Sequence, residues 1–315
     1  MNRRSAMRTL MTASAGCLLP PLFARPGDDD QDDLIIRTET RLVLLDVSVK
    51  NPAGGFVSGL SKENFSVFEN GRPQSIMTFD QGDLPVTVGI LVDESRSMAS
   101  KRPAVLTAAL SFIAESNPKD EIFVLNFNDD VKPGLLSPML FSDDIQELRS
   151  ALFRGVSEGR TVLNDAVVAG LEQLELGMRD KKALVLISDG GDNASMHTRR
   201  QTIDRVERST ATIYTIGLYD DEDPDRDPGI LRQLAGISGG EAYFPPTPMD
   251  TVPTCRRIAR DIRARYTLGY VPAAGKPTNN VRNIRVGASA PGHAKLIART
   301  RSSYRYDQAD TQKRK

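Results

Sequence analysis

Residues 84–97 read LPVTVGILVDESRS, an apolar run followed directly by alternating oxygen-bearing side chains. A continuous apolar run of this length is typical of a parallel strand that is buried on both faces. In open α/β sheets, the loops after the carboxyl ends of such strands form the ligand sites. The side chains of Asp93, Ser95 and Ser97 therefore leave three alternatives open: a metal loop, the start of a serine-nucleophile site, or a polar cap on the next helix.

Beyond this strand, the apolar pattern alternates between strand and helix periods. Strands are expected at residues 121–127, 182–188, 211–218 and 240–245, and helices at residues 102–116, 142–155, 163–176, 198–209, 228–238 and in a segment ending near residue 266. Ser142 is expected to open its helix, with Asp143 and Asp144 in the first turn. The alternation predicts an α/β fold with a doubly wound, mostly parallel sheet covered by helices on both faces.

Strand patterns without helices flank this α/β domain, which we assign to residues 84–263. Residues 34–83 contain alternating apolar segments separated by Gly- and Pro-containing turns, and residues 264–306 return to the same pattern. Extending a parallel sheet would require crossover helices, which these segments lack. We expect the two β segments to pair as a small β-sandwich into which the α/β domain is inserted.

The amino terminus has the order of an export signal in residues 1–24. Arg3, Arg4 and Arg8 precede a weakly apolar stretch that ends in a small residue. NRRSAM resembles a twin-arginine signal, and SAGC resembles a lipoprotein box that would allow a lipid anchor at Cys17. The expected location is therefore periplasmic, cell-surface or secreted, with the membrane reached only through such an anchor.

Composition limits the remaining classes of function. The 315 residues include 41 basic and 41 acidic side chains, and this balance argues against a nucleic-acid binder that works through bulk charge. Residues 25–33 form an acidic linker, and residues 307–315 are polar and expected to be disordered. Signal cleavage would leave no internal disulfide framework, and Cys255 is expected to be a buried small side chain rather than a nucleophile.

Two further loops supply matching oxygen groups: Thr161 precedes a helix in GRTVLNDA, and Asp189 follows a buried strand in LVLISDGGDN. Together with the 93–97 loop, their order and spacing resemble the metal-ion-dependent adhesion site (MIDAS) of von Willebrand factor type A domains. The resemblance covers residues 84–263. The flanks GLSKENFSVFENGRPQ, RYTLGYVP and ARTRSSYRY also resemble segments of a bacterial exported family of von Willebrand factor A-related proteins.

The resemblance implies a ligand set for a divalent cation. Ser95, Ser97 and Thr161 would lie nearest the ion, while Asp93 and Asp189 would hold it directly or through waters. Mg²⁺ is implied as the cofactor, with Mn²⁺ or Ca²⁺ as alternatives, because hard cations prefer oxygen ligands. The sequence departs from the family pattern where Arg96 and Arg160 replace frequent glycines, and either side chain would crowd or electrostatically weaken the site.

The resemblance further implies a non-enzymatic adhesion module. Neutral hydroxyls with only two carboxylates leave the cation incompletely neutralised, so a partner protein can supply an Asp or Glu side chain as a further ligand. One alternative is a metal-assisted hydrolase, although no GxSxG elbow is present and the only histidines are His197 and His293. Another is a structural envelope protein with a degenerate site.

The acidic stretch at residues 220–229 spaces its carboxylates like a calcium loop. Counting from Asp223, Pro228 and Leu234 occupy the positions where an EF-hand loop requires glycine and glutamate. We interpret this stretch as a solvated acidic loop after a strand. His197 is expected at an exposed helix start, with the rim of the candidate site as the alternative.

Overall fold

A computed structural model describes residues 42–219, 225–272, 281–293 and 295–305, all within one compact unit. The expected signal segment, the acidic linker and the polar tail lie outside the described residues, as do residues 220–224 of the acidic loop. Within the described part, no helix is long and apolar enough to cross a membrane.

The central sheet has six strands in the order β10-β9-β8-β5-β6-β7. The strands are β5 (Val86–Asp93), β6 (Glu121–Phe127), β7 (Val131–Pro133), β8 (Lys181–Ser188), β9 (Thr212–Gly217) and β10 (Ala242–Tyr243). All neighbours pair in parallel except β7, which is antiparallel to β6. The predicted mostly parallel sheet is confirmed. The sequence pattern missed β7 because a strand of three residues is too short to show a period.

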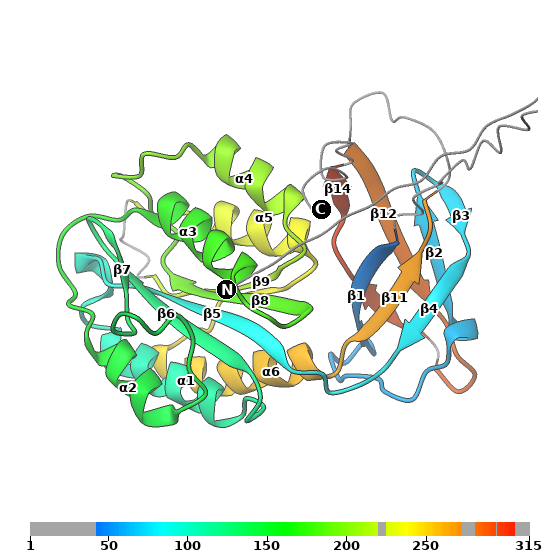
Figure 1. Cartoon of the computed structure of the whole chain (residues 1–315), viewed down its shortest axis with the longest axis horizontal. Coiled ribbons are helices and arrows are strands. Elements are labelled where there is room, and N and C mark those ends of the chain that lie inside the picture. Colours follow the sequence, from blue (N-terminus) through cyan, green and yellow to red (C-terminus); the bar gives the residue numbers. More distant parts are fainter. Residues whose placement is uncertain (1–41, 220–224, 273–280, 294, 306–315) are drawn as a thin grey trace, which may run out of the picture. The chain divides into compact units, whose positions relative to one another are not determined.

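In the described part of the chain, helices cover both faces of this sheet (Figure 1). They are α1 (Arg102–Ala114), α2 (Ile145–Phe153), α3 (Leu163–Glu175), α4 (Arg199–Arg208), α5 (Pro228–Ser238) and α6 (Thr251–Arg263). Helices α3, α4 and α5 lie on one face, and α1, α2 and α6 on the other. The doubly wound arrangement predicted from the sequence is therefore confirmed.

The strand β5 is buried at all of its positions, as its apolar run predicted. Gly89 lies at its centre, where a Cβ atom would fall 2.4 Å from Phe123 Cζ and 2.5 Å from Leu184 Cδ2. Only glycine leaves room there for these two core side chains from β6 and β8. The close packing holds the three strands in register, so that their carboxyl ends form one edge.

The start of α2 differs from the prediction. The cap is Asp144, whose Oδ1 accepts from the backbone N–H groups of Gln146 at 2.6 Å and Glu147 at 3.1 Å. Ser142 was expected there, but its backbone exchanges hydrogen bonds with Ile122 beside the sheet. That bridge keeps Ser142 in an extended conformation, so the helix begins later.

The flanking segments form two four-stranded antiparallel sheets in the orders β13-β1-β11-β4 and β14-β12-β2-β3. The strands are β1 (Val43–Lys50), β2 (Phe65–Glu69), β3 (Arg72–Gln74), β4 (Ile76–Asp80), β11 (Tyr266–Tyr270), β12 (Val281–Ala288), β13 (Ile297–Arg299) and β14 (Ser303–Arg305). The expected pairing of the two segments is present, because β1 pairs with β11 and β2 with β12. One buried apolar cluster draws side chains from both sheets.

The short strands β13 and β14, at the end of the second β segment, belong to different sheets. β13 pairs with β1 in one sheet, and β14 pairs with β12 in the other. Ser302 lies between the two short strands and accepts a hydrogen bond from the Ile284 N–H. The chain changes sheets at this point, so one pattern becomes two strands.

Candidate functional site

The candidate ligands Asp93 and Asp189 lie at the ends of neighbouring parallel strands. Asp93 is the last residue of β5, Asp189 directly follows β8, and each is 2% exposed. Ser97 Oγ donates a hydrogen bond to Asp189 Oδ2, and Ser188 Oγ donates one to Asp93 Oδ2. The fold thus brings together two carboxylates that are far apart in the sequence.

The loop after β5 folds back over the strand end. The Ser95 N–H donates to Asp93 Oδ1 at 2.9 Å, and the hydroxyl oxygens of Ser95 and Ser97 lie 3.1 Å apart. A short 3-10 turn, η2 (Arg96–Met98), follows, and α1 begins only at Arg102, without a side-chain cap. The helix-cap alternative for this loop is therefore wrong, since none of these oxygens caps α1.

The backbone of Thr161 is hydrogen-bonded to the loop that follows Asp189. Its N–H donates to Asn193 Oδ1 at 3.0 Å, and its carbonyl accepts from the N–H groups of Asn193 at 3.1 Å and Ala194 at 3.2 Å. Gly159, two residues earlier, accepts from the Arg96 N–H at 3.5 Å. The loop of Thr161 is therefore bonded to both of the loops that carry the carboxylates, and Thr161 itself is buried.

The two carboxylates of the site interact electrostatically. Burial and the neighbouring Asp189 raise the pKa of Asp93 to about 7, although hydrogen bonds from Ser188 and Ser95 act in the opposite direction. A divalent cation beside the two carboxylates would remove their repulsion. In the described part of the chain, no three His, Cys, Asp or Glu side chains cluster as metal ligands. The residues present fit a hard cation held by two carboxylates and hydroxyl groups.

Glu94 is a site-adjacent residue that sequence reasoning missed. Its carboxylate is 1% exposed, pairs with Arg102 Nε at 2.8 Å and accepts from Ser157 Oγ at 2.6 Å. The same arginine donates to the Gly155 carbonyl at 2.6 Å. Glu94 therefore fastens the loop that leads to Thr161. The only signal in the sequence was a basic residue eight positions after an acid, which is common in any chain.

The two arginines that depart from the family pattern are exposed. The Arg160 side chain is 66% exposed and pairs with Asp129, with 3.1 Å between Nε and Oδ1. Hydrogen bonds from the backbone and side chain of Arg160 lower the pKa of Asp129. Arg96 is also exposed. The Arg160 side chain thus contacts Asp129, and the expectation that either arginine weakens the candidate site stays a prediction.

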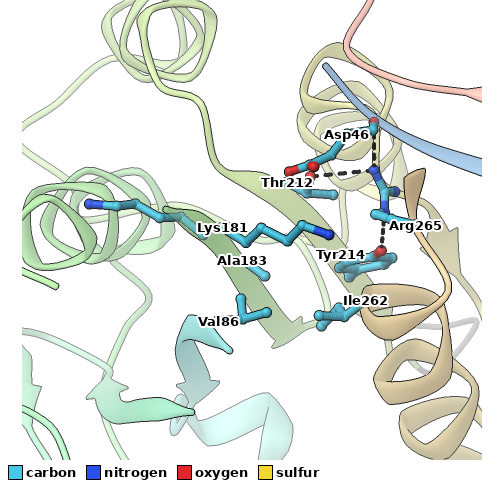
Figure 2. Close-up of a pocket in the computed structure, with 9 residues that line it drawn as sticks. Asp46, Val86, Lys181, Ala183, Thr212, Tyr214, Ile262 and Arg265 are labelled. Carbon is cyan, nitrogen blue, oxygen red and sulfur yellow. Dashed lines mark hydrogen bonds between the residues drawn. The ribbon is translucent and has the colours of Figure 1, made fainter. Parts of the chain in front are cut away.

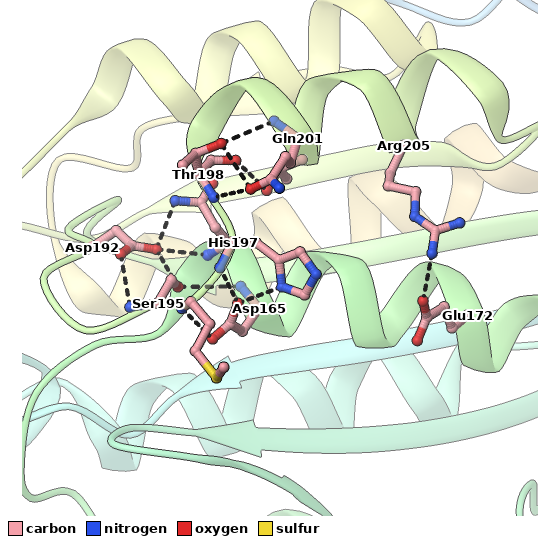
Figure 3. A network of polar contacts seen from close by, with 11 residues as sticks. Asp165, Glu172, Asp192, Ser195, His197, Thr198, Gln201 and Arg205 are labelled. Atoms are coloured by element: carbon pink, nitrogen blue, oxygen red, sulfur yellow. Dashed lines mark hydrogen bonds and ion pairs between the residues drawn. The ribbon is translucent and has the colours of Figure 1, made fainter.

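A polar network joins the Asp189 loop to the start of α3 (Figure 3). Asp192 accepts from Asn164, and the loop's own Ser195 donates to the same oxygen, Oδ2, at 2.6 Å. In return, Asp165 on α3 accepts from the N–H groups of Met196 and His197, each at 2.8 Å. Burial opposes ionisation of Asp165, but these bonds and the His197 ring bring its pKa below the usual value.

His197 was expected at an exposed helix start, and the structure adds a partner. It directly precedes Thr198, the cap of α4, and its side chain is 43% exposed. Its Nδ1 lies 2.6 Å from Asp165 Oδ1. The ring therefore contacts α3 and not the candidate ligands.

A separate cavity of about 10 Å³ lies beside Arg265, with Asp46, Lys181 and Tyr214 among its lining residues (Figure 2). That volume holds about one water molecule. Arg265 donates to Tyr214 Oη at 3.0 Å and to the Asp46 carbonyl at 3.1 Å. We interpret this place as a structural junction and not as a ligand site.

Comparison with known proteins identifies the domain family and similar folds. Residues 87–254 match the von Willebrand factor type A domain family. A von Willebrand factor type A structure from Catenulispora acidiphila is similar with a TM-score of 0.50 at 14% identity, covering 89% of this chain and 77% of that one. The vWF domain of a type V pili tip protein from Porphyromonas gingivalis has a TM-score of 0.47 at 14% identity, covering 62% of this chain and 99% of that one.

The PilB minor pilin from Streptococcus sanguinis is similar with a TM-score of 0.48 at 13% identity, covering 59% of this chain and 63% of that one. A search of curated proteins found no match. The matched residues 87–254 make up more than half of the chain and contain every candidate ligand. The protein therefore belongs to the von Willebrand factor type A domain family.

Proposed function

We propose that the protein is a non-enzymatic protein-binding module. Asp93, Ser95, Ser97, Thr161 and Asp189 would hold a divalent cation, Mg²⁺ or alternatively Mn²⁺ or Ca²⁺, that bridges to an Asp or Glu of a partner protein. The observation that carries this proposal is the pair of buried carboxylates at adjacent strand ends, with burial and repulsion raising the pKa of Asp93 to about 7.

The carboxylates are oriented before a cation binds. The Ser95 N–H holds Asp93 at 2.9 Å, and the Gly191 N–H holds Asp189 at 2.9 Å. Such pre-organisation lowers the entropy that binding must overcome. Ser97 is only partly buried, so the site can be reached from its side.

The bound cation would supply a positive charge that the protein's own ligands neutralise incompletely. Hydroxyl groups are neutral, and Mg²⁺ usually keeps several waters when few carboxylates surround it. A partner carboxylate can replace one of these waters with a charge-assisted contact. The affinity for the partner would therefore depend on both the cation and the partner's negative charge.

We also propose that the protein is exported, to the periplasm, the cell surface or the medium. The support is the order of basic, apolar and small residues in residues 1–24. Fractionation of cells that express the tagged chain tests this proposal. The control is the double variant Arg3→Lys, Arg4→Lys. Retention of the parent chain in the cytoplasm would contradict it.

Calorimetric titration of the chelator-treated protein with Mg²⁺ and Mn²⁺ tests the metal site. We expect about one ion per chain, and loss of binding in Asp93→Ala and Asp189→Ala with the fold retained. Asp143→Ala is the matched control, because it removes an exposed carboxylate from another loop. If the parent protein binds no ion at millimolar metal, the site is structural and the degenerate-site alternative is favoured.

Binding of a partner carboxylate is tested separately. Surface-immobilised protein is probed with peptide pools that present Asp or Glu and with matched pools that carry Asn or Gln. We expect binding that requires both the carboxylate and Mg²⁺ and that is lost with chelator. Equal binding of the amide pools would exclude carboxylate bridging. Turnover of ester or phosphoester substrates that requires Asp93 would instead favour the hydrolase alternative.

A further inference from the structure

Two aspartates that are not candidate ligands accept hydrogen bonds across the contact between the Asp189 loop and α3 (Figure 3). Asp192 on the loop accepts from the Asn164 N–H at 2.7 Å and from Asn164 Nδ2 at 2.8 Å, both on Oδ2. Asp165 on α3 accepts from two backbone N–H groups of the loop and contacts the His197 ring. We name this arrangement the reciprocal clamp, formed by Asp192 and Asp165.

The clamp joins the two segments that a bound cation would have to share. Asp192 lies three residues after Asp189, and Asn164 lies three residues after Thr161. Residues 189–198 form no helix or strand, so no regular hydrogen-bond ladder fixes their path. The position of Asp189 relative to Thr161 therefore depends on the backbone bonds from Asn193 and Ala194 to the Thr161 carbonyl and on side-chain contacts. The clamp supplies side-chain contacts to α3 directly after Thr161.

A second observation points to a functional constraint on this pair. Asn164 is 7% exposed, and its Oδ1 is a buried atom for which no hydrogen-bond partner is found in the described structure. Its amide is oriented by donating Nδ2 to Asp192, which leaves the oxygen without a donor. A buried unsatisfied acceptor costs about 1–3 kcal/mol and in native folds calls for an explanation such as an ordered water or ion.

We propose that Asp192 and Asp165 are positioning residues of the cation site. They hold the Asp189 loop against the first turn of α3, so that the Asp189 carboxylate and the Thr161 hydroxyl reach the same ion. This inference rests on the proposed function, since it assigns a role in the affinity of that same site.

The test is the affinity of the full chain for Mn²⁺ and Mg²⁺ in Asp192→Ala and Asp165→Ala. Removing groups that orient metal ligands typically weakens binding by roughly 10- to 100-fold, and we expect a loss in this range. Asp192→Asn keeps an acceptor oxygen for the Asn164 N–H, so we expect it to recover part of the affinity. The electron paramagnetic resonance spectrum of bound Mn²⁺ should also change in the alanine variants.

Asp144→Ala is the matched control, because Asp144 also accepts two backbone N–H groups at a helix start but lies on α2. It should lower stability without changing the metal affinity or the Mn²⁺ spectrum. Equal affinity of Asp192→Ala and the parent, or an equal loss in Asp144→Ala, would overturn the inference while leaving the metal site intact. A parent protein that binds no ion would overturn the proposed function and this inference together.

Discussion

Ser188, the last residue of β8, donates a hydrogen bond from its hydroxyl to Oδ2 of Asp93, the last residue of β5. The bond joins the ends of two parallel strands and directs one oxygen of Asp93 toward β8. Gly190 in turn donates its N–H to Ser188 Oγ at 3.0 Å. A buried carboxylate is thereby held next to Asp189, and both burial and this neighbour disfavour its ionisation, which has a consequence for stability.

The stability of the metal-free protein should fall as pH rises from about 4 to about 7. The pKa of Asp93 is raised from 3.8 to about 7 in the folded protein by burial and by Asp189. In that window, the folded chain keeps a proton that the unfolded chain has released, so raising the pH favours unfolding. Denaturant unfolding with chelator at pH 5 and pH 7.5 measures the effect, as the difference between parent and Asp93→Asn.

Saturating Mg²⁺ should restore the stability lost at pH 7.5, because the cation takes the place of the proton. Asp93→Asn should show neither the pH dependence nor the restoration by Mg²⁺. A parent protein whose stability relative to this variant does not change between the two pH values would contradict the assignment.

Arg265→Met should destabilise the protein by about 3–5 kcal/mol, as expected when one partner of a buried charge network is removed. Arg265 is 3% exposed, donates to the Gly239 carbonyl at 2.7 Å and lies 3.7 Å from Asp261. The change leaves these acceptors without their donor inside the fold. The free energy of unfolding measures the loss.

Arg256→Ala is the control for Arg265→Met, since Arg256 lies on α6 and pairs with Glu115 at 3.9 Å on the surface. Exposed pairs of this kind contribute about 0–1 kcal/mol. Similar losses in both variants would mean that the junction beside Arg265 contributes no more than a surface contact.

Glu94→Ala should lower stability by about 3 kcal/mol, because it leaves the Arg102 guanidinium without its buried partner. About one bound ion per chain should remain, since Glu94 is engaged by Arg102 and Ser157 and not by the candidate ligands. A double-mutant cycle with Arg102→Ala should give a coupling of about 1–3 kcal/mol. Loss of the ion with unchanged stability would instead make Glu94 a ligand.

Arg160→Ala should change the Mg²⁺ affinity by less than about threefold, because Asp129 already balances this exposed charge. Arg96→Ala should raise the affinity by about two- to fivefold at low salt, with the gain shrinking as ionic strength rises. Titrations at two salt concentrations measure both. A larger gain in Mg²⁺ affinity from Arg160→Ala than from Arg96→Ala would contradict the expectation that Arg96 weakens the site more than Arg160 does.

Much of the α/β fold could be predicted because its signals are local. The strand at residues 121–127 and the helix at residues 228–238 occur where the apolar period placed them. The edge strand β7 and the placing of β13 and β14 in two different sheets could not be predicted in this way. Both depend on which strand lies alongside, and a run of three residues carries no period.

For the candidate site, the sequence supplied the residue types and the loops but not the contacts. Asp93, Ser97 and Asp189 follow from their positions after apolar runs. In the structure, the Ser95 N–H donates to Asp93 and the Ser97 hydroxyl donates to Asp189. The sequence pattern did not single out Glu94, which lies between the candidate ligands Asp93 and Ser95. Its pairing with Arg102 depends on how α1 packs, which no local pattern encodes.

The sequence by itself determined the alternation of elements, the two β segments that flank the α/β domain, and the oxygen-bearing loops at strand ends. These follow from side-chain periodicity over a few neighbouring residues. Only the tertiary structure decided that Ser188 would bond Asp93, that Asp192 would accept from Asn164 and Asp165 from His197, and that Arg265 would be buried. Such pairs are set by the packing of strands and helices that are distant in the chain, and that packing minimises the free energy of the whole fold rather than of any one segment.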